Sequence, residues 1–501
     1  MGTGLKISYR QILDVLEKEH LLVEHNIENL DAEIDFISHD SRNIINNTLF
    51  FCKGEGFKEE YLWDAVKKGA VCYEAEKKYD LNGLDCKYII VSDILHAIAL
   101  IAPLYYNYAY KNLEIIGMTG TKGKTTVAYF IKNIMDEFAQ SETALISTVE
   151  TYTGKRREQS HISTPEPCDL QQYFHEMYQS GIKYLTMEVT SQAYKRDRVK
   201  NIKFNNGIFL NISEDHIGPG EHDDFEDYLN CKSEFMRNCS NIVINAETDC
   251  FEHVLEAAKS SETLRQITLY GSEKSKGKCD YYYSDLKKED GVLTFTVKND
   301  KIDYCERFAI KTYGIFNVEN ATAAIAMCRT IGVDCESIRR GLLKTEVPGR
   351  MTVFEHNGVT VIVDYAHNLL SFTKLYESLR ADYPGNKIIS VGGAPGGKSY
   401  KRRKDFADVV GKHSDYIYLT AEDPQFEDIT KICEDIADYM PGAACEIVPD
   451  RAEAVTKAIK SAKSGDVVAL LAKGEEEYQK VNGKWEFYES DLKIARRVLH
   501  E

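Results

Sequence analysis

Gly117-Met-Thr-Gly-Thr-Lys-Gly-Lys-Thr-Thr126 is the most informative segment of this chain. It follows the short apolar run Leu113-Glu-Ile-Ile116 and opens a helical pattern, which is typical of a turn between a buried strand and a helix. Backbone N–H groups of a glycine-rich turn and of a helix N-terminus point at anions. The strict Walker pattern has Gly where Met118 stands, so the loop is a variant. The Gly-Lys-Thr-Thr run after a strand still predicts nucleotide binding.

Two side chains of this loop have specific expected roles. We expect Lys124 to reach the terminal phosphates of ATP and Thr125 to ligate Mg²⁺. The other loop residues predicted to bind ATP are Gly120, Thr121, Gly123 and Thr126.

Length and composition restrict the class of protein. A chain of 501 residues predicts about three domains of ~150 residues each. The net charge of −17 argues against a nucleic-acid binder, which needs basic surfaces. The 13 Cys include no CxxC pair, no signal-peptide core is visible, and the longest apolar stretch, 94–106, is too short to span a bilayer. We therefore expect a cytoplasmic protein, a monomer, that binds neither nucleic acid nor membrane.

Apolar runs alternate with helical patterns along most of the chain. This alternation is typical of parallel sheets covered by helices on both faces. We predict an α/β fold with an N-terminal domain over 1–110, a central domain over 111–346 and a C-terminal domain over 347–501, with a hinge at Val347-Pro-Gly-Arg350. The expected strands are 113–116, 143–146, 184–189, 206–210, 242–244, 359–363, 387–391, 416–419 and 467–471, and looser alternation at 279–298 predicts a side hairpin.

Polar residues follow several of these strands, where ligands bind in open α/β sheets. Glu188 ends an apolar strand, and because burying an unpaired carboxylate is costly, we interpret it as a Mg²⁺ ligand. His216 follows another strand and is a further candidate for the site. Asp364 and His367 follow the first strand of the C-terminal domain and suit ribose or phosphate contacts. Arg350 would bring positive charge to a γ-phosphate.

Two basic features have a simpler interpretation when taken alone. Lys232 has the surroundings of a solvated lysine on a helix. The run Lys398–Lys404 is typical of a solvated basic face.

Together the motifs resemble the Mur ligase family, the ATP-dependent amide-forming enzymes of peptidoglycan precursor synthesis. The resemblance covers nearly the whole chain and keeps the family's motif order, through Asp40-Ser-Arg42, Thr119–Thr126, Ser163-Thr-Pro-Glu166, Met187-Glu-Val-Thr-Ser191, Asp215-His216, Gly314-Ile-Phe-Asn317, Asn320, Pro348-Gly-Arg350, Asp364-Tyr-Ala-His367 and Lys473-Gly474. It implies a central P-loop-type parallel sheet, flanked by an N-terminal α/β UDP-binding domain and a C-terminal Rossmann-like domain. The Ser-Thr-Pro-Glu and Met-Glu-Val-Thr-Ser segments are similar to the branch that joins a diamino acid to UDP-N-acetylmuramoyl-L-alanyl-D-glutamate.

The resemblance also implies residue roles. It makes Lys124, Glu188, His216 and Lys232 catalytic, with a metal site formed by Thr125, Glu188, His216 and a carbamylated Lys232. It assigns ATP contacts to Asn317, Asn320, Arg350, Asp364 and His367. It assigns the nucleotide-sugar peptide to Ser163, Thr164, Ser191 and Arg198, and its uridine end to Ser41 and Arg42. In the implied reaction a substrate carboxylate attacks the γ-phosphate of ATP, and an amine displaces phosphate from the resulting acyl phosphate.

The identity of the amino acid depends on Glu422-Asp-Pro-Gln425. Diaminopimelate-adding members carry Asp-Asn-Pro-Arg there, and their Arg binds the additional carboxylate bidentately. Here Gln425 replaces that Arg and Asp423 replaces Asn, which favours an ε-ammonium group, with Glu476 facing the substrate amine. The segments around 396–406 and 420–428 and Asp215-His-Ile-Gly-Pro219 are also similar to lysine-adding members, so L-lysine is predicted.

The chain departs from the family at two positions. Glu475 stands where many members have His, and Lys122 stands where Asn is common. The same reaction with diaminopimelate, ornithine or another diamino acid stays an alternative. So do a folylpolyglutamate synthase, disfavoured by the Ser-Thr-Pro-Glu and Asp-Ser-Arg segments, a non-catalytic ATP-binding partner of a ligase complex, and a transport or motor P-loop ATPase.

Overall fold

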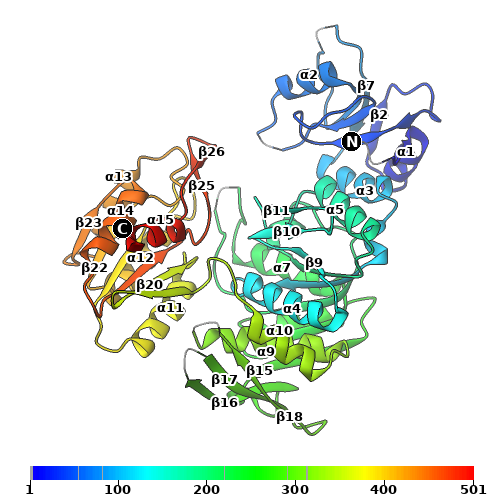
Figure 1. Cartoon of the computed structure of the whole chain (residues 1–501). Helices are drawn as coiled ribbons and strands as arrows, with labels where there is room; N and C mark the ends of the chain where they lie inside the picture. Colours follow the sequence, from blue (N-terminus) through cyan, green and yellow to red (C-terminus); the bar gives the residue numbers. More distant parts are fainter. Residues whose placement is uncertain are drawn as a thin grey trace.

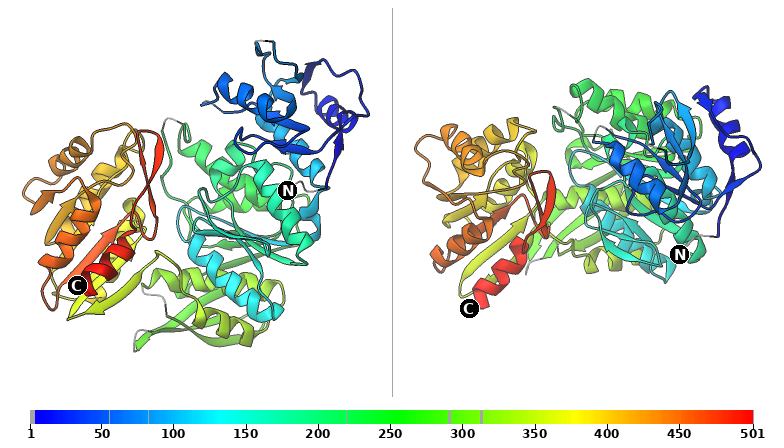
Figure 2. Two further views of the ribbon diagram at one scale, coloured as in Figure 1. Left: turned by 45° about the horizontal axis from the view of Figure 1, so that its top comes forward. Right: turned by 90° about the horizontal axis from the view of Figure 1, so that it is seen from above.

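The computed structural model describes residues 4–54, 56–81, 83–218, 220–289, 292–311 and 314–500. Within these residues the chain forms three α/β parts, each with a main sheet of its own. The N-terminal part, blue in Figure 1, lies above the central part, and the C-terminal part, yellow to red, lies beside it. Figure 2 shows the same separation from two further directions. The predicted three-part α/β fold is confirmed, and its boundaries at 110 and 346 stay a prediction.

The N-terminal part has a five-stranded sheet in the order β2-β7-β6-β5-β4, parallel except for β2. Gly69, at φ 119°, ends α2 and leads directly into β6. A Cβ on Gly69 would lie 2.6 Å from Asn46 Oδ1, so glycine is required at this turn. The elements are β1 (Ile7–Ser8), α1 (Tyr9–Lys18), β2 (Leu22–His25), β3 (Glu33–Ile34), β4 (Phe36–Ser38), β5 (Thr48–Phe51), α2 (Glu59–Lys68), β6 (Ala70–Ala75), β7 (Lys87–Val91) and α3 (Ile94–Tyr105).

The central sheet has the order β11-β10-β9-β12-β8-β13-β14-β15-β16-β17-β18. It is parallel from β9 to β16 and antiparallel at both edges. The side hairpin expected at 279–298 is β16 and β17, and it extends the main sheet. The strands are β8 (Glu114–Thr119), β9 (Ala144–Ile146), β10 (Glu150–Tyr152), β11 (Arg157–Gln159), β12 (Tyr184–Glu188), β13 (Phe204–Phe209), β14 (Cys239–Asn245), β15 (Gln266–Ser272), β16 (Tyr281–Glu289), β17 (Val292–Asn299) and β18 (Tyr304–Ile310).

Helices cover both faces of this sheet. One face packs on α4, α9 and α10, and the other on α5, α7 and α8. Helix α10 packs very closely on α4 at Gly341. A Cβ added at this position would lie only 2.4 Å from Ile134 Cα. The helices are η1 (Ala109–Asn112), α4 (Lys124–Ala139), α5 (Pro167–Gln179), α6 (Ser191–Lys195), α7 (Phe225–Arg237), α8 (Phe251–Lys259), η2 (Glu273–Ser275), α9 (Phe316–Thr330) and α10 (Cys335–Lys344).

The C-terminal sheet has the order β19-β20-β24-β21-β22-β23 and is parallel except for β19. Helices α11 to α13 pack on one face, and α14 and α15 on the other. The elements are β19 (Thr352–His356), β20 (Val359–Asp364), α11 (Leu369–Asp382), β21 (Ile388–Gly392), α12 (Lys401–His413), β22 (Tyr416–Leu419), α13 (Ile429–Asp438), β23 (Cys445–Ile447), α14 (Arg451–Ser461), β24 (Val467–Leu471), β25 (Tyr478–Val481), β26 (Lys484–Phe487) and α15 (Asp491–His500).

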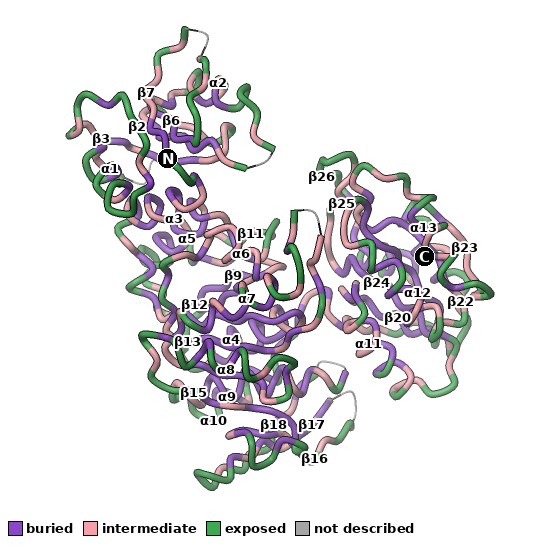
Figure 3. The backbone as a smooth tube through the Cα atoms, turned by 180° about the vertical axis from the view of Figure 1, so that it is seen from behind, coloured by how far each residue is buried: buried purple, intermediate pink, exposed green. Residues whose placement is uncertain are grey.

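Each part has a buried interior of its own, visible as purple tube in Figure 3. None of the helices in the described residues is both long enough and apolar enough to cross a bilayer.

A buried ion pair holds the C-terminal part together. The Arg451 guanidinium is fully buried and donates to both carboxylate oxygens of Asp491, at 2.9 and 2.7 Å. It also donates to the carbonyls of Ala421 and Leu471, which follow β22 and end β24. One cation therefore joins the starts of α14 and α15 to two strand ends.

Replacing Asp491 by Ala should lower the free energy of unfolding by about 3–5 kcal/mol, because the Arg451 charge would remain buried without compensation. Chemical denaturation of the whole chain, followed by circular dichroism, measures the change. In the control Glu446→Ala, the broken pair with Lys457 has both side chains 42% exposed, and the loss should stay below about 1 kcal/mol. Equal, small losses in the two variants would contradict this role of Asp491.

Candidate active site

A cleft of about 490 Å³ lies between the central and C-terminal parts, at the carboxyl ends of β8, β12, β13 and β20. Most of the residues predicted for the site line it: Thr121, Gly123, Lys124, Thr125, Thr126, Ser163, Thr164, Glu188, Ser191, Arg198, His216, Lys232, Asn317, Asn320, Arg350, Asp364, His367, Asp423 and Glu476. Ser41 and Arg42 do not line it and lie in the N-terminal part. Residues that lie more than 350 positions apart in the sequence thus meet at one cleft.

The phosphate loop begins later than the sequence pattern indicates. Met118 is a fully buried residue of β8, so the loop starts after Thr119. Gly123, at φ 88°, precedes the first turn of α4, and a Cβ there would lie 2.5 Å from Asn320 Oδ1. Glycine is therefore needed for α9 to pack against the loop, with the N-terminus of α4 facing the cleft.

Two lysine side chains meet at one carbonyl group below this loop. Lys124 Nζ and Lys232 Nζ both donate to the Gly120 carbonyl, at 2.7 and 2.9 Å. Lys232 is only 2% exposed, so the prediction of a solvated lysine, made from the local sequence alone, is wrong. Burial, and then the Lys124 charge, hold the pKa of Lys232 well below its usual value. The lowered pKa favours the neutral amine of Lys232, the form that reacts with CO₂.

The Glu188 carboxylate lies at the bottom of the cleft and is fully buried. Its oxygens accept hydrogen bonds from the Thr148 N–H at 2.8 Å and the Thr148 hydroxyl at 3.0 Å. The Thr148 hydroxyl also pairs with Ser163 Oγ, at 2.7 Å, and Thr164 Oγ1 donates to the Glu188 carbonyl. The carboxylate is thus held by a donor on each oxygen, in the wall of the cleft.

The donor set of the cleft fits a magnesium ion. Thr125 and Glu188 offer the hydroxyl and carboxylate oxygens that Mg²⁺ prefers. His216 adds an imidazole that is held at Nδ1 by Glu221, at 3.1 Å. A carbamate on Lys232 would add a further oxygen ligand.

Asp215 connects the central part to the C-terminal part. Its side chain is 3% exposed. It accepts from Arg402 at 3.0 Å and from the Asn368 amide at 2.6 Å, and it lies 3.7 Å from Lys122 Nζ. Although burial raises the pKa of Asp215, these cations, led by Arg402, hold it well below its usual value. A single carboxylate therefore binds groups from two parts of the molecule.

His367 and Lys122 make a second contact across the same boundary. His367 Nδ1 lies 2.7 Å from the Tyr365 carbonyl, which only accepts, so Nδ1 carries the proton. Nε2 then accepts from Lys122 Nζ, at 2.9 Å. Burial lowers the pKa of Lys122 to about 7. The residue that departs from the family at position 122 thus links the phosphate loop to the C-terminal part.

Arg350 and Asp364 lie on the C-terminal wall of the cleft. The guanidinium of Arg350 lies 4.2 Å from the centre of the Tyr365 ring, a cation–π contact. Both oxygens of Asp364 accept backbone N–H groups, from Met351 and Ala366, each at 2.8 Å. Asp364 thus fixes the backbone just after the hinge that carries Arg350.

The acidic end of the cleft is arranged differently from the sequence prediction. The carboxylates of Asp423 and Glu476 are already paired with a protein amine and so are not reserved for a ligand amine. Buried Lys473 Nζ lies 3.0 Å from Asp423 Oδ1 and 2.6 Å from Glu476 Oε2. Glu422, which the sequence analysis did not single out, is buried in the cleft wall with Oε2 lacking a hydrogen-bond partner. Burial is the main cause that raises the pKa of Glu422 to about 7. Pro219 of the lysine-type motif lies outside the described residues.

Arg198 and Ser191 lie at the side of the cleft nearer the N-terminal part. Arg198 binds Glu166 at 2.6 Å, and Lys53 of the N-terminal part binds the same carboxylate. These two cations outweigh the effect of burial and lower the pKa of Glu166 to about 2. The Ser-Thr-Pro-Glu segment is therefore the junction between these two parts.

Several site residues were missed from the sequence. The run 398–404 is not simply a solvated face, because Arg402 and Arg403 are 8% and 4% exposed. Arg403 binds Glu427 and Asp435, and Arg402 binds Asp215. The one available signal was the run's position just after a strand end, in a loop that opens a helix.

A phosphate loop, a buried acid with buried lysines, and a second α/β unit that completes the cleft define a nucleotide-dependent enzyme of the multidomain P-loop type. Family models support a more specific assignment. The description "Mur ligase middle domain" matches residues 118–328, and "Mur ligase, glutamate ligase domain" matches 349–474. The chain belongs to the Mur ligase family.

Relatives of full length agree with this family. The UDP-N-acetylmuramoyl-L-alanyl-D-glutamate--L-lysine ligase of Enterococcus faecalis is 38% identical and aligns over 99% of this chain and 100% of its own. A UDP-N-acetylmuramyl-tripeptide synthetase of Lactobacillus delbrueckii subsp. bulgaricus is 36% identical, over 99% of both chains. A solved UDP-N-acetylmuramoyl-L-alanyl-D-glutamate--2,6-diaminopimelate ligase has the same fold, with a TM-score of 0.63 at 22% identity over 99% of both chains.

Lys232 should carry a carbamate in solution, because burial and the Lys124 charge favour its neutral amine, the nucleophile that CO₂ needs. With ¹³C-bicarbonate, NMR of the protein should show a carbamate signal that is lost in Lys232→Ala. The exposed Lys431→Ala variant is the control and should keep the signal. A wild-type protein without any carbamate signal would exclude this modification.

Proposed function

We propose that this enzyme uses ATP to join L-lysine to UDP-N-acetylmuramoyl-L-alanyl-D-glutamate, in the cytoplasm, through an acyl phosphate. The observation that carries the proposal is the single cleft in which the phosphate loop, Glu188 with Lys232, and the acidic Glu422 end meet. The relatives' names agree in reaction, and one of them specifies L-lysine.

The residues of the cleft suit the meeting of two anions. A substrate carboxylate must approach the γ-phosphate, so the site has to offset their mutual repulsion. Lys124, the loop N–H groups and Arg350 supply positive charge on three sides of the position of the phosphates. A bound Mg²⁺ would add further charge neutralisation, with Thr125, Glu188, His216 and a carbamylated Lys232 as its ligands. The contacts of Asp215 hold the C-terminal part against this site.

Glu422 is the group we assign to the side-chain ammonium of the amino acid. Lys473 already neutralises much of the charge on Asp423 and Glu476. Glu422 retains an oxygen without a partner in a buried position, and a carboxylate oxygen there accommodates an ammonium better than a second carboxylate. No guanidinium stands at position 425 to receive the extra carboxylate of diaminopimelate.

Phosphate release with Mg-ATP and the UDP-linked dipeptide tests the proposal, with L-lysine, meso-diaminopimelate and L-ornithine added separately. L-lysine alone should stimulate release and yield a product heavier by one lysine residue. Stimulation by diaminopimelate or ornithine instead would keep the ligase and contradict the assigned amino acid. Phosphate release that needs no nucleotide sugar would favour an ATPase, and no response to any amino acid would favour a non-catalytic partner.

Binding of L-lysine should depend on pH through Glu422. Burial raises its pKa to about 7, so the carboxylate that attracts an ammonium forms only as the pH rises through that value. KM for L-lysine should therefore fall as the pH increases from 6 to 8, on the order of tenfold.

The variant Glu422→Gln checks this assignment. It should raise KM for L-lysine at pH 8 about 30-fold, from the loss of ~2 kcal/mol of charge pairing, and flatten the pH profile. The exposed Glu434→Gln on α13 is the matched control and should keep both the KM and the profile of the wild type. If the pH profile of Glu422→Gln is unchanged, a group other than Glu422 binds the side-chain ammonium of L-lysine.

A further inference from the structure

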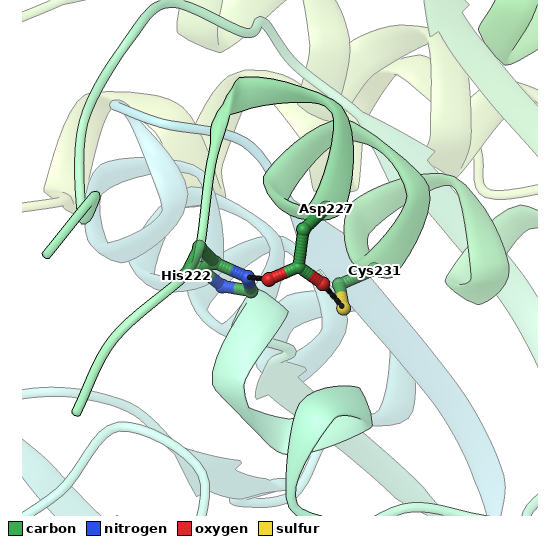
Figure 4. Close-up of side chains that lie close together, drawn as sticks. All are labelled: His222, Asp227 and Cys231. Carbon is green, nitrogen blue, oxygen red and sulfur yellow. Dashed lines mark hydrogen bonds and ion pairs between the residues drawn. The ribbon is translucent and has the colours of Figure 1, made fainter. Parts of the chain in front are cut away.

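Ser191, at the cleft, is hydrogen-bonded to the buried His222, which in turn is hydrogen-bonded to the half-buried Asp227. His222 Nε2 lies 2.9 Å from Ser191 Oγ, and His222 Nδ1 lies 3.0 Å from Asp227 Oδ2. Figure 4 shows the ring of His222, on the segment before α7, pointing at Asp227 on that helix. Cys231, one turn further along α7, donates to the other oxygen of the same carboxylate, at 3.5 Å.

The surroundings fix which atom carries each proton. Asp227 also accepts from Lys195 Nζ at 2.6 Å and from the Asp223 N–H at 3.1 Å. Burial raises the pKa of Asp227, but these hydrogen bonds hold it below its usual value. An ionised carboxylate only accepts, so Nδ1 of His222 must carry the proton.

This tautomer decides whether the Ser191 hydroxyl donates a hydrogen bond to His222 or accepts one from it. The Lys195 ammonium already compensates the Asp227 charge, and His222 is fully buried, so the imidazole is neutral. A neutral imidazole with its proton on Nδ1 has a lone pair on Nε2, and the Ser191 hydroxyl donates to it. The remaining lone pairs of Ser191 Oγ therefore accept a hydrogen from the cleft.

His222, Asp227 and Cys231 also place three possible metal-ligand atoms within 4.8 Å of one another. The contacts argue against an ion there. Both oxygens of Asp227 already accept hydrogen bonds, and a cation would have to displace the Lys195 ammonium as well as the proton on His222.

We propose that His222 and Asp227 are positioning residues that hold the Ser191 hydroxyl as a hydrogen-bond acceptor. The Ser191 oxygen then receives an amide N–H from the peptide of the UDP-linked dipeptide. The inference rests on the proposed function and specifies which group of the substrate this side of the cleft recognises. An acceptor oxygen repels a carboxylate and attracts an N–H, so Ser191 selects the peptide bond of the stem rather than its acidic ends. Arg198, on the same side, supplies positive charge instead.

Asp227→Asn is the decisive variant. It keeps the shape of the side chain but removes its charge. The amide oxygen, which must also accept from Lys195 and the Asp223 N–H, then holds the proton on His222 Nδ1 less firmly, and this weakens Ser191 as an acceptor. Asp227→Asn and Ser191→Ala should each raise KM for the UDP-linked dipeptide about tenfold or more. KM for ATP should stay within about twofold of the wild type in both.

A double-mutant cycle separates this role from a structural one. Asp227→Asn should have little further effect on KM for the nucleotide in a Ser191→Ala background, because both act through one hydroxyl. Cys231→Ala removes the contact to the other carboxylate oxygen and should behave as the wild type. Additive effects in the cycle, or a normal KM in Asp227→Asn, would overturn the inference. A wild-type protein that forms no product from the nucleotide would instead contradict the proposed function.

Discussion

The buried Asp215 carboxylate is the interaction on which the assembled site depends. A charge that is 3% exposed is tolerated only when it is fully compensated, and here the compensation comes from three different segments. Arg402 and Asn368 belong to the C-terminal part, and Lys122 belongs to the phosphate loop. Because no single part supplies all of these groups, the buried carboxylate is compensated only where both parts meet.

The interior of the site is positive in a protein whose net charge is −17. Lys232 is buried and Lys122 and Lys124 are half-buried around one loop, and desolvation lowers the pKa of each. Mutual repulsion and desolvation make this arrangement unfavourable in the absence of anions. An incoming phosphate chain relieves that cost, so the cluster stores binding energy for a polyanion.

The sequence predicts the frame of the site better than its electrostatics. The strand ends that carry Glu188, His216 and Asp364 follow from apolar runs with sharp ends, because the hydrophobic pattern is local. The phosphate loop follows for the same reason, although its start was misjudged at buried Met118. The role of Arg402 was not predictable, since its partner lies 187 residues away in the chain. The burial of Glu422 and the ion pairs of Lys473 were not predictable for a related reason, although both residues stand in quoted motifs. Whether a charged side chain is solvated or buried depends on packing between parts, which leaves no local pattern.

The three main sheets are built from consecutive segments, over 22–91, 114–310 and 352–471. During translation, domains fold as units in the order in which they leave the ribosome. The phosphate loop and the Gly120 carbonyl with its two lysines are therefore complete while Arg402 is still to be synthesised. A nascent chain at that stage holds the phosphate loop without the acidic end of the cleft. The last third of the polypeptide thus adds the second wall of the cleft to a finished phosphate loop.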